Sequence, residues 1–228
     1  MPFSAEEVNA ILLSVRVAAC SVIVGLLPAL FFAYILARFE FKGKSLLDSL
    51  IHLPLVIPPV VTGYLLIIFL GRHSLIGGFF EKIGIKFAFN WKGAVAAALV
   101  MSFPLLVRPI RLSIEAIDRG LEDAARTLGA GRARVFMTVT LPLSLPGIIS
   151  GSVLALARSL GEFGATMTFV SNIPGETQTL PLALYSYTQT PGGEIMAGRL
   201  CAVSIVIAAA ALAASNILAE RAKKRIQK

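Results

Sequence analysis

The amino-acid sequence predicts an all-α fold, a polytopic bundle of helices that cross a membrane. Of the 228 residues, 56% are hydrophobic and only 15% are charged, against about 25% in ordinary soluble domains. The mean hydropathy is +0.80, and the apolar residues come in long runs rather than in an alternating pattern. Such runs are typical of segments that lie in lipid. We expect residues 1–228 to form a single transmembrane domain, because the sequence has no internal repeat or low-complexity linker.

Five apolar runs are long enough to cross a bilayer, which takes about 20 residues of helix. They cover approximately residues 8–37, 46–70, 93–112, 143–169 and 200–219. The first run is long enough to tilt or to project beyond the bilayer. The segment 179–188 is apolar enough for a short helix or a partial sixth span, and the sequence leaves that choice open.

The second run contains three prolines, Pro54, Pro58 and Pro59. Proline removes a backbone donor and clashes with the preceding turn, so this helix must kink or break. In lipid, the freed carbonyl groups are tolerated only where protein or water satisfies them. The break is therefore either part of a helix that lines a pathway or an ordinary packed kink.

The distribution of Lys and Arg predicts the orientation, because cytoplasmic loops carry an excess of these residues. One set of loops carries fourteen and the opposite set five. We therefore expect the N-terminus outside, the C-terminus in the cytoplasm, and a large cytoplasmic loop at about 113–141. The richer set comprises Arg38, Lys42, Lys44, Arg108, Arg111, Arg119, Arg126, Arg132, Arg134, Arg221, Lys223, Lys224, Arg225 and Lys228, and the poorer set Arg72, Lys82, Lys86, Lys92 and Arg199.

The same placement of charge argues against a nucleic-acid partner. The formal net charge is +8, but the basic residues lie between apolar runs, where they set topology. Cys20 and Cys201 both lie inside apolar runs without neighbouring Cys or His, so we expect two small hydrophobes and no metal site. No nucleophile and base occur in a catalytic pattern, so we expect no enzymatic activity in this chain.

The predicted cytoplasmic loop contains a short helix of two to three turns outside the membrane. Acids at its start, Glu122 and Asp123, favour the positive end of a helix dipole, and Gly129 suits a left-handed cap at its end. Ala124, Ala125 and Leu128 fall on one face by their spacing. A low-relief apolar face of this kind is suited to a groove in another protein.

Here the sequence resembles a known family. The order Asp123, Ala124, Ala125, then Gly129 and the segment VTLP at 139–142 is similar to the EAA loop of ABC importer permeases. The resemblance implies that residues 122–129 are the coupling helix that docks on an ATPase subunit, within a type I importer permease fold. Two departures are mild: Asp123 stands where Glu is usual, and Val139 stands for Ile.

The resemblance extends to the molybdate permeases of that family. It is carried by HLPLVIPPVVTGY at 52–64, ARSLGEFGAT at 157–166, FVSNIPGET at 169–177 and QTPGGE at 189–194. Sulfate and thiosulfate permeases share the GEFG stretch, but 169–194 looks closer to the molybdate proteins. The resemblance therefore implies that the chain imports an oxyanion, molybdate, and tungstate is left open because the two dianions are nearly the same size.

The resemblance also implies the partners. They are a second copy of this chain, two ATP-binding subunits and an extracytoplasmic oxyanion-binding protein. The sequence contains no G-x-x-x-x-G-K-[ST] phosphate loop, so any ATP must bind on a partner, and we expect no cofactor in this chain. ATP binding would draw two coupling helices together and switch the bundle from inward-facing to outward-facing.

Four residues of the fourth run are candidates for the pathway or its gate: Arg158, Ser159, Glu162 and Thr166. Charges at bilayer depth usually face protein or water. Arg158 and Glu162, four residues apart on one helix face, either neutralise each other or line the anion path. Glu162 would repel a dianion, so neither is assigned as a substrate ligand. Ser159 and Thr166 carry hydroxyls that bond either a passing oxyanion or their own backbone.

Two readings from other classes compete with an ABC permease. A proton-driven secondary transporter would use Glu162 and Arg158 as a relay and would need no ATPase, but it gives the loop at 122–142 no role. A membrane enzyme or quinone-binding anchor would need histidine clusters or metal-ligand patterns in the spans, which the sequence lacks.

Overall fold

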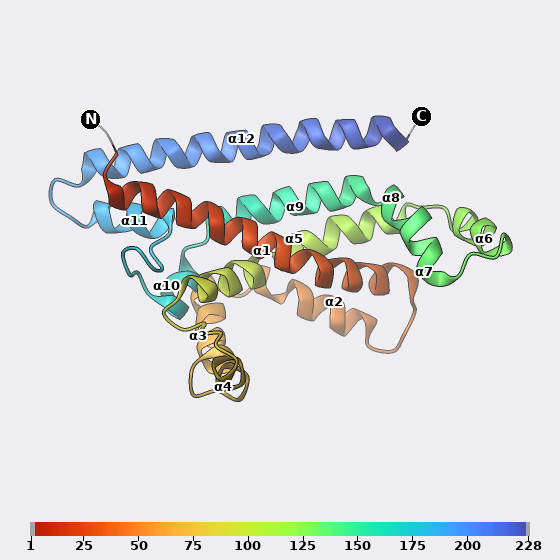
Figure 1. Cartoon of the computed structure of the whole chain (residues 1–228), viewed down its shortest axis with the longest axis horizontal. Helices are drawn as coiled ribbons and strands as arrows, with labels where there is room; N and C mark the ends of the chain where they lie inside the picture. Colours follow the sequence, from red (N-terminus) through yellow and green to blue (C-terminus); the bar gives the residue numbers. More distant parts are fainter. Residues whose placement is uncertain (1–2, 227–228) are drawn as a thin grey trace.

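The computed structural model describes the backbone of residues 3–226 and the side chains of residues 3–214 and 217, and every regular element in this part is helical. Four long helices run along the long axis of the molecule: α1 (Ala5–Arg38), α5 (Trp91–Glu115), α9 (Leu145–Leu160) and α12 (Glu194–Ile226) (Figure 1). The shorter elements are α2 (Lys44–His52), η1 (Leu53–Leu55), α3 (Pro59–Leu70), α4 (Leu75–Lys82), α6 (Arg119–Thr127), α7 (Arg132–Val135), the π-helix η2 (Phe136–Thr140), α8 (Leu141–Leu143), α10 (Gly164–Val170) and α11 (Leu180–Thr188).

Small residues let α1, α5 and α9 approach one another closely. Ala29 and Ala33 of α1 and Ala155 of α9 are fully buried around Leu106 and Ile110 of α5. Lipid gives no hydrophobic drive for helices to associate, so close van der Waals packing at small residues takes its place. These three helices form the centre of the bundle.

The ends of the membrane layer are marked on α1 by two arginines. The guanidinium of Arg16 lies 3.8 Å from the centre of the Trp91 ring, at the start of α5, and tryptophan is typical of the membrane interface. Arg38 is the last residue of α1. At 1.5 Å per residue the two arginines are about 33 Å apart, close to the roughly 30 Å of a hydrocarbon core. The first turns of α1 therefore project about 16 Å beyond the bilayer.

The second predicted span is broken, as its prolines require. Helix α2 leads through η1 to a break before α3, and the two halves of this span are bent by 112°. Pro59 begins α3, where a missing N–H leaves no bond unmade. The third and fifth predicted spans lie within α5 and α12, and the first lies within α1.

The fourth predicted span, 143–169, is wrong as one continuous helix. Helical structure already begins at Arg132, bends by 66° before α9, and stops at Leu160. Residues 161–163 are not helical, and α10 starts anew at Gly164. Pro142 lies in α8, within the helical structure that precedes the bend. Three described helices are long and apolar enough to cross a membrane, and the two bent pairs raise the number to as many as five.

Segment 179–188, left open by the sequence, forms the short helix α11, which is about 14 Å long and too short to cross a bilayer. It packs near the projecting start of α1 and the start of α12, where Ala10, Ala183 and Leu200 form a small buried cluster. Helix α12 has only 11% of its most apolar window buried. Most of its length in the membrane therefore faces outward from this chain.

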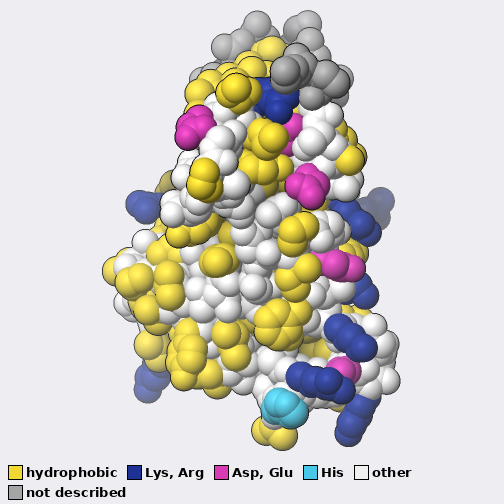
Figure 2. Space-filling model, turned by 90° about the vertical axis from the view of Figure 1, so that its left-hand side faces the viewer, with side chains coloured by type: hydrophobic (Ala, Val, Ile, Leu, Met, Phe, Trp, Pro, Cys, Tyr) yellow, Lys and Arg dark blue, Asp and Glu magenta, His cyan; other side chains and the backbone are white. Residues whose placement is uncertain are grey.

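The end of the molecule where the chain begins carries both apolar and basic side chains (Figure 2). Helices α3 and α4 project from one side of the bundle near this end (Figure 1). On α4 the side chains of Leu75 and Phe79 are largely exposed, and the basic residues Arg72, Lys82 and Lys86 are exposed around them. Helices α6 and α7 and the end of α12 lie at the opposite end of the molecule.

The close approach of α9 to α5 predicts the effect of replacing Gly147 by Ala. A Cβ atom there would lie 2.4 Å from Cβ of Ser113 and 2.5 Å from the carbonyl oxygen of Pro109. Because backbone must shift to admit it, we expect Gly147→Ala to destabilise the chain by about 1–3 kcal/mol and to lower the Tm of the detergent-solubilised protein. Gly198→Ala on α12, where no atom lies within 4 Å, is the control and should leave Tm unchanged. Equal Tm values for the two variants would contradict this packing.

Candidate functional site: an exposed helix at one end and a break within the bundle

The predicted loop helix is present as α6, nine residues long, at the end of the molecule opposite the N-terminus (Figure 1). Oδ1 of Asp118 accepts a hydrogen bond of 2.9 Å from the Gly120 N–H and so caps its start. Gly129 ends it with a φ of +86°, the left-handed conformation expected there. The predictions of a short helix and of its glycine stop are confirmed.

One exposed face of α6 is apolar, and charged side chains flank it. Ala124 and Leu128 are exposed, Leu128 to 88%, while Ala125 is half-buried. Asp123 is also exposed and forms an ion pair of 2.7 Å with Arg126, one turn later. This face is not covered by any described part of the chain. The residues grouped by their spacing thus share an accessible surface, except that Ala125 lies at its edge.

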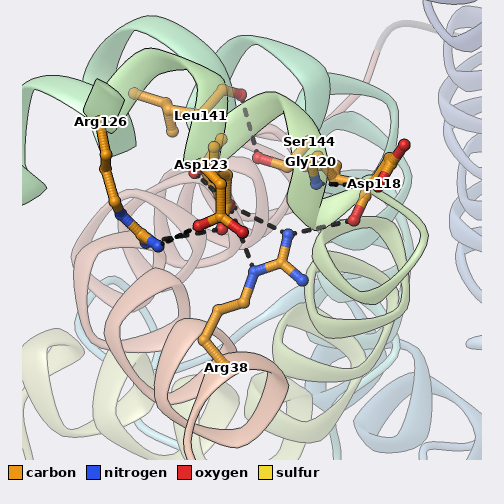
Figure 3. Close-up of polar contacts among 10 residues, drawn as sticks. Arg38, Asp118, Gly120, Asp123, Arg126, Leu141 and Ser144 are labelled. Carbon is orange, nitrogen blue, oxygen red and sulfur yellow. Dashed lines mark hydrogen bonds and ion pairs between the residues drawn. The ribbon is translucent and has the colours of Figure 1, made fainter. Parts of the chain in front are cut away.

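Glu122 lies on the opposite side of α6 and is 3% exposed. Its Oε1 accepts hydrogen bonds from Nε and Nη2 of Arg38, at 3.2 and 3.0 Å, and from Oγ1 of Thr140, at 2.7 Å. Arg38, at the end of α1, points toward α6, the helix that carries Gly120, Asp123 and Arg126 (Figure 3). Of the predicted coupling residues, Glu122 is therefore turned toward the bundle, while Asp123 faces away from it.

A cavity of about 530 Å³ opens beside α6 and is predominantly basic. Its charged lining consists of four arginines and two carboxylates. Arg38 pairs with Glu122 and Arg126 with Asp123, while Arg119 and Arg132 add further positive charge. Positive charge at this end also acts on Glu40 nearby. A hydrogen bond and the charge of Lys44 lower the pKa of Glu40, and Arg119 and Arg111 lower it further. The surface beside α6 thus favours an acidic partner group.

The second candidate region is the break between α9 and α10. Arg158, in the last turn of α9, forms an ion pair of 2.6 Å with Oε2 of Glu162. The other oxygen of Glu162 accepts a hydrogen bond of 2.8 Å from the Ala165 N–H, at the start of α10. Glu162 therefore lies past the end of α9 rather than on its face. The pairing of the two charges is confirmed, although the shared helix face is not.

The other two candidates in this region are enclosed by protein. Ser159 is 6% exposed and lies 3.0 Å from the hydroxyl of Ser21 on α1. Thr166 is 1% exposed. Of the four predicted pathway residues, only Arg158 has a partly exposed side chain, at 28%. The described residues contain no group of three or more His, Cys, Asp or Glu side chains that could hold a metal ion.

Two residues of the site at α6, Arg38 and Thr140, are not predicted from the sequence. In the sequence, Arg38 is one of many basic residues that set membrane topology, and Thr140 is one position of the VTLP segment. Neither has a specific role predicted for it. Their bonds to Glu122 join residues 84 and 18 positions apart. The sequence shows two adjacent acids, Glu122 and Asp123, and it does not indicate which of them is buried or what its partner is.

An all-helical membrane bundle with an exposed helix at one end is the fold of importer permeases. A permease chain of the bacterial importer for the acidic polysaccharide alginate matches with a TM-score of 0.72 at 18% identity, over 99% of this chain and 82% of that one. The methionine transporter MetNI, in an inward-facing conformation, matches with a TM-score of 0.75 at 15% identity, over 96% and 99%. Both likenesses show a common fold.

The family follows from the sequence of residues 25–228, which matches the "Binding-protein-dependent transport system inner membrane component". The chain belongs to this family. It is 60% identical over 220 residues to the molybdenum transport system permease protein ModB of Escherichia coli K12, with 96% of each chain covered. It is 55% identical over 221 residues to ModB of Haemophilus influenzae, again with 96% of each covered. The sulfate permease protein CysW of Synechococcus elongatus is 37% identical, over 88% of this chain and 72% of that one.

The double role of Glu162 predicts how the break responds to substitution. Glu162→Ala removes both the acceptor for the buried Ala165 N–H and the partner of Arg158, whose side chain is 28% exposed. A buried donor left without its hydrogen bond destabilises by about 1–3 kcal/mol. We expect a large fall in Tm. The double variant Arg158→Met with Glu162→Gln removes both charges and keeps an amide acceptor, so its Tm should return to near the wild-type value. A double variant as unstable as Glu162→Ala would show that the charge itself is required.

Proposed function

We propose that this chain is the membrane-spanning permease of an ABC importer that moves molybdate into the cytoplasm, driven by ATP hydrolysis on a separate subunit. The observation that carries the proposal is α6, a short helix with an uncovered apolar face at the end where α1 finishes. A permease needs such a feature to receive force from an ATPase. The membership in the family of binding-protein-dependent systems supports the same reading.

The proposed assembly contains two copies of this chain, two ATP-binding subunits and an extracytoplasmic oxyanion-binding protein. The uncovered α6 face suits a groove in the ATP-binding subunit, and the basic cavity beside it favours acidic side chains there. The exposed length of α12 is available to lipid or to the second copy. ATP is the only cofactor of the assembly, and it binds on the partner.

Molybdate is the proposed cargo because of the relatives. Two proteins described as molybdenum transport permeases are 55–60% identical to this chain over nearly its full length, whereas a sulfate permease is 37% identical. The difference in identity favours molybdate over sulfate. A proton-driven mechanism has no observation in its favour, since it would leave the exposed α6 face without a role.

In the proposed cycle, ATP binding draws two copies of α6 together and shifts the bundle from an inward-facing to an outward-facing packing. The N-terminus faces the exterior and α6 the cytoplasm. This orientation is supported by the excess of Lys and Arg at the α6 end. Arg158 is the proposed pathway residue, because its side chain is partly exposed, and Glu162 holds it in place.

Leu128→Asp tests the docking face directly. Leu128 is 88% exposed in this chain, so the substitution should leave its own fold intact while burying an unpaired charge in the interface. We expect binding to the ATP-binding subunit to weaken by at least about 2 kcal/mol, or roughly thirtyfold, measured by co-purification with the tagged permease. Leu128→Met keeps the contact apolar and should bind normally. Normal binding and uptake by Leu128→Asp would contradict the assignment of this face.

The cargo is tested by the response of ATP hydrolysis to the loaded binding protein. In the reconstituted complex, we expect faster hydrolysis with the molybdate-loaded binding protein than with the same protein loaded with sulfate. The empty binding protein provides the baseline. Equal stimulation by the two anions, or stronger stimulation by sulfate, would remove molybdate as the proposed cargo without affecting the proposed class of transporter.

A further inference from the structure

Helix α6 is attached to the bundle by charge rather than by apolar packing. Glu122 is the one buried residue among the nine of this helix. Its largest apolar neighbours, Leu121 and Leu128, are 51% and 88% exposed. A surface helix normally buries an apolar stripe against its core. Because α6 lacks a buried stripe, its position depends on what holds the Glu122 carboxylate.

Three separate segments converge on that carboxylate. Arg38 closes α1, and its Nε and Nη2 both donate to Oε1 of Glu122. Nη2 of Arg38 also donates to the carbonyl oxygen of Ile117, at 3.3 Å, in the link between α5 and α6. Thr140 closes the π-helix η2 and donates to the same Oε1. The arginine and glutamate side chains are 8% and 4% exposed.

This geometry resists relative movement of the segments. Hydrogen bonds to a charged group are roughly twice as strong as those between neutral groups, and burial from water strengthens them further. The planar guanidinium fixes direction as well as distance. A displacement of α6 must therefore carry Arg38 and Thr140 with it or leave a buried charge unpaired.

The position of Thr140 extends the contact toward the membrane. π-Helical turns are rare and occur frequently at functional sites. Here the π-helix occupies the five residues before α8, and the chain then bends by 66° into α9. Helix α9 ends at Leu160, two residues after Arg158 and beside the break that Glu162 bridges. A force on Thr140 thus acts at the N-terminal end of α9, the helix that leads to the proposed pathway.

We propose that Arg38, Glu122 and Thr140 form an ionic clasp that transmits the movement of α6 to α1 and to the base of α9. The three are positioning residues, which touch neither the transported anion nor ATP. The inference rests on the proposed function, in which α6 is moved by an ATPase. If the clasp is weakened, the complex still hydrolyses ATP, but less of the hydrolysis results in transport.

The test compares two rates in proteoliposomes that contain the whole complex, with the binding protein loaded with molybdate. Glu122→Gln removes the charge at nearly constant shape, and Arg38→Lys keeps the charge but loses the two-pronged contact. For both we expect ATP hydrolysis within about twofold of wild type and anion uptake per ATP reduced by about tenfold, within the usual range of coupling between sites. Thr140→Val should also reduce anion uptake per ATP, by less than the other two variants.

A matched control uses another Arg–Glu pair at the same end of the molecule. Arg111 Nε and Glu115 Oε1 are 2.7 Å apart within α5, but the pair does not contact α6. Glu115→Gln should leave both rates unchanged. The double variant Arg38→Met with Glu122→Gln removes both charges and leaves neither unpaired. It should lose no more uptake per ATP than either single variant, because residues that act as one unit are not additive.

The possible results separate the clasp from the proposed function. Wild-type uptake per ATP in Glu122→Gln and Arg38→Lys would overturn the clasp, and so would a double variant whose loss is the product of the single losses. A parallel loss of assembly, hydrolysis and uptake, with a lowered Tm, would assign the cluster a purely structural role and would also overturn it. Failure of the wild-type chain to assemble with any ATP-binding subunit would instead overturn the proposed function.

Discussion

The fold depends on the inability of lipid to satisfy a broken backbone. The chain interrupts its membrane helices near 56–58 and again at 161–163, and each interruption frees polar groups that hydrocarbon cannot bond. The two breaks lie against each other. A Cβ atom on Gly164 would come within 2.9 Å of Cβ of Pro59, and one on Gly63 within 2.7 Å of the carbonyl oxygen of Ala165. Helices α3 and α10 pack together at this junction, while Val56, Pro58 and Gly161 within the breaks are exposed in this chain.

The carboxylate of Glu162 completes this arrangement. It replaces the missing helical acceptor for the Ala165 N–H and at the same time neutralises Arg158. One residue therefore satisfies both a freed backbone donor and a side-chain charge at the membrane break. A charged side chain in a membrane span is costly. The Glu162 side chain is needed here because α9 ends beside it and leaves the Ala165 N–H without a helical acceptor.

Features set by local sequence were predictable. Long apolar runs indicate α1, α5 and α12, and the prolines near 58 indicate the first break. The residues that begin and end α6, Asp118 and Gly129, lie within or beside that helix. The second break was not predictable in this way. Residues 161–163 include a glycine but no proline, and the run is apolar enough to read as one helix. Only tertiary contact with α3 decides that the backbone leaves the helix there.

The orientation of Glu122 shows the same limit at the functional site. Spacing along a helix identifies which residues share a face, but it does not say which face meets the bundle. Glu122 and Asp123 are adjacent acids at the start of α6, yet one is buried and the other exposed. The difference is made by Arg38, which is 84 residues away in sequence. No local pattern encodes a contact at that distance.

The projection of α1 beyond the bilayer has an electrostatic consequence. About 16 Å of this helix stands above the hydrocarbon, and the headgroups occupy only about the first 5–8 Å of that height. The remainder is comparable to the roughly 8 Å over which salt screens surface charge at physiological ionic strength. A charged group near the tip of α1 would therefore interact only weakly with negatively charged lipids. The local potential there is set by the protein's own side chains, among them Arg199, which pairs with Glu7.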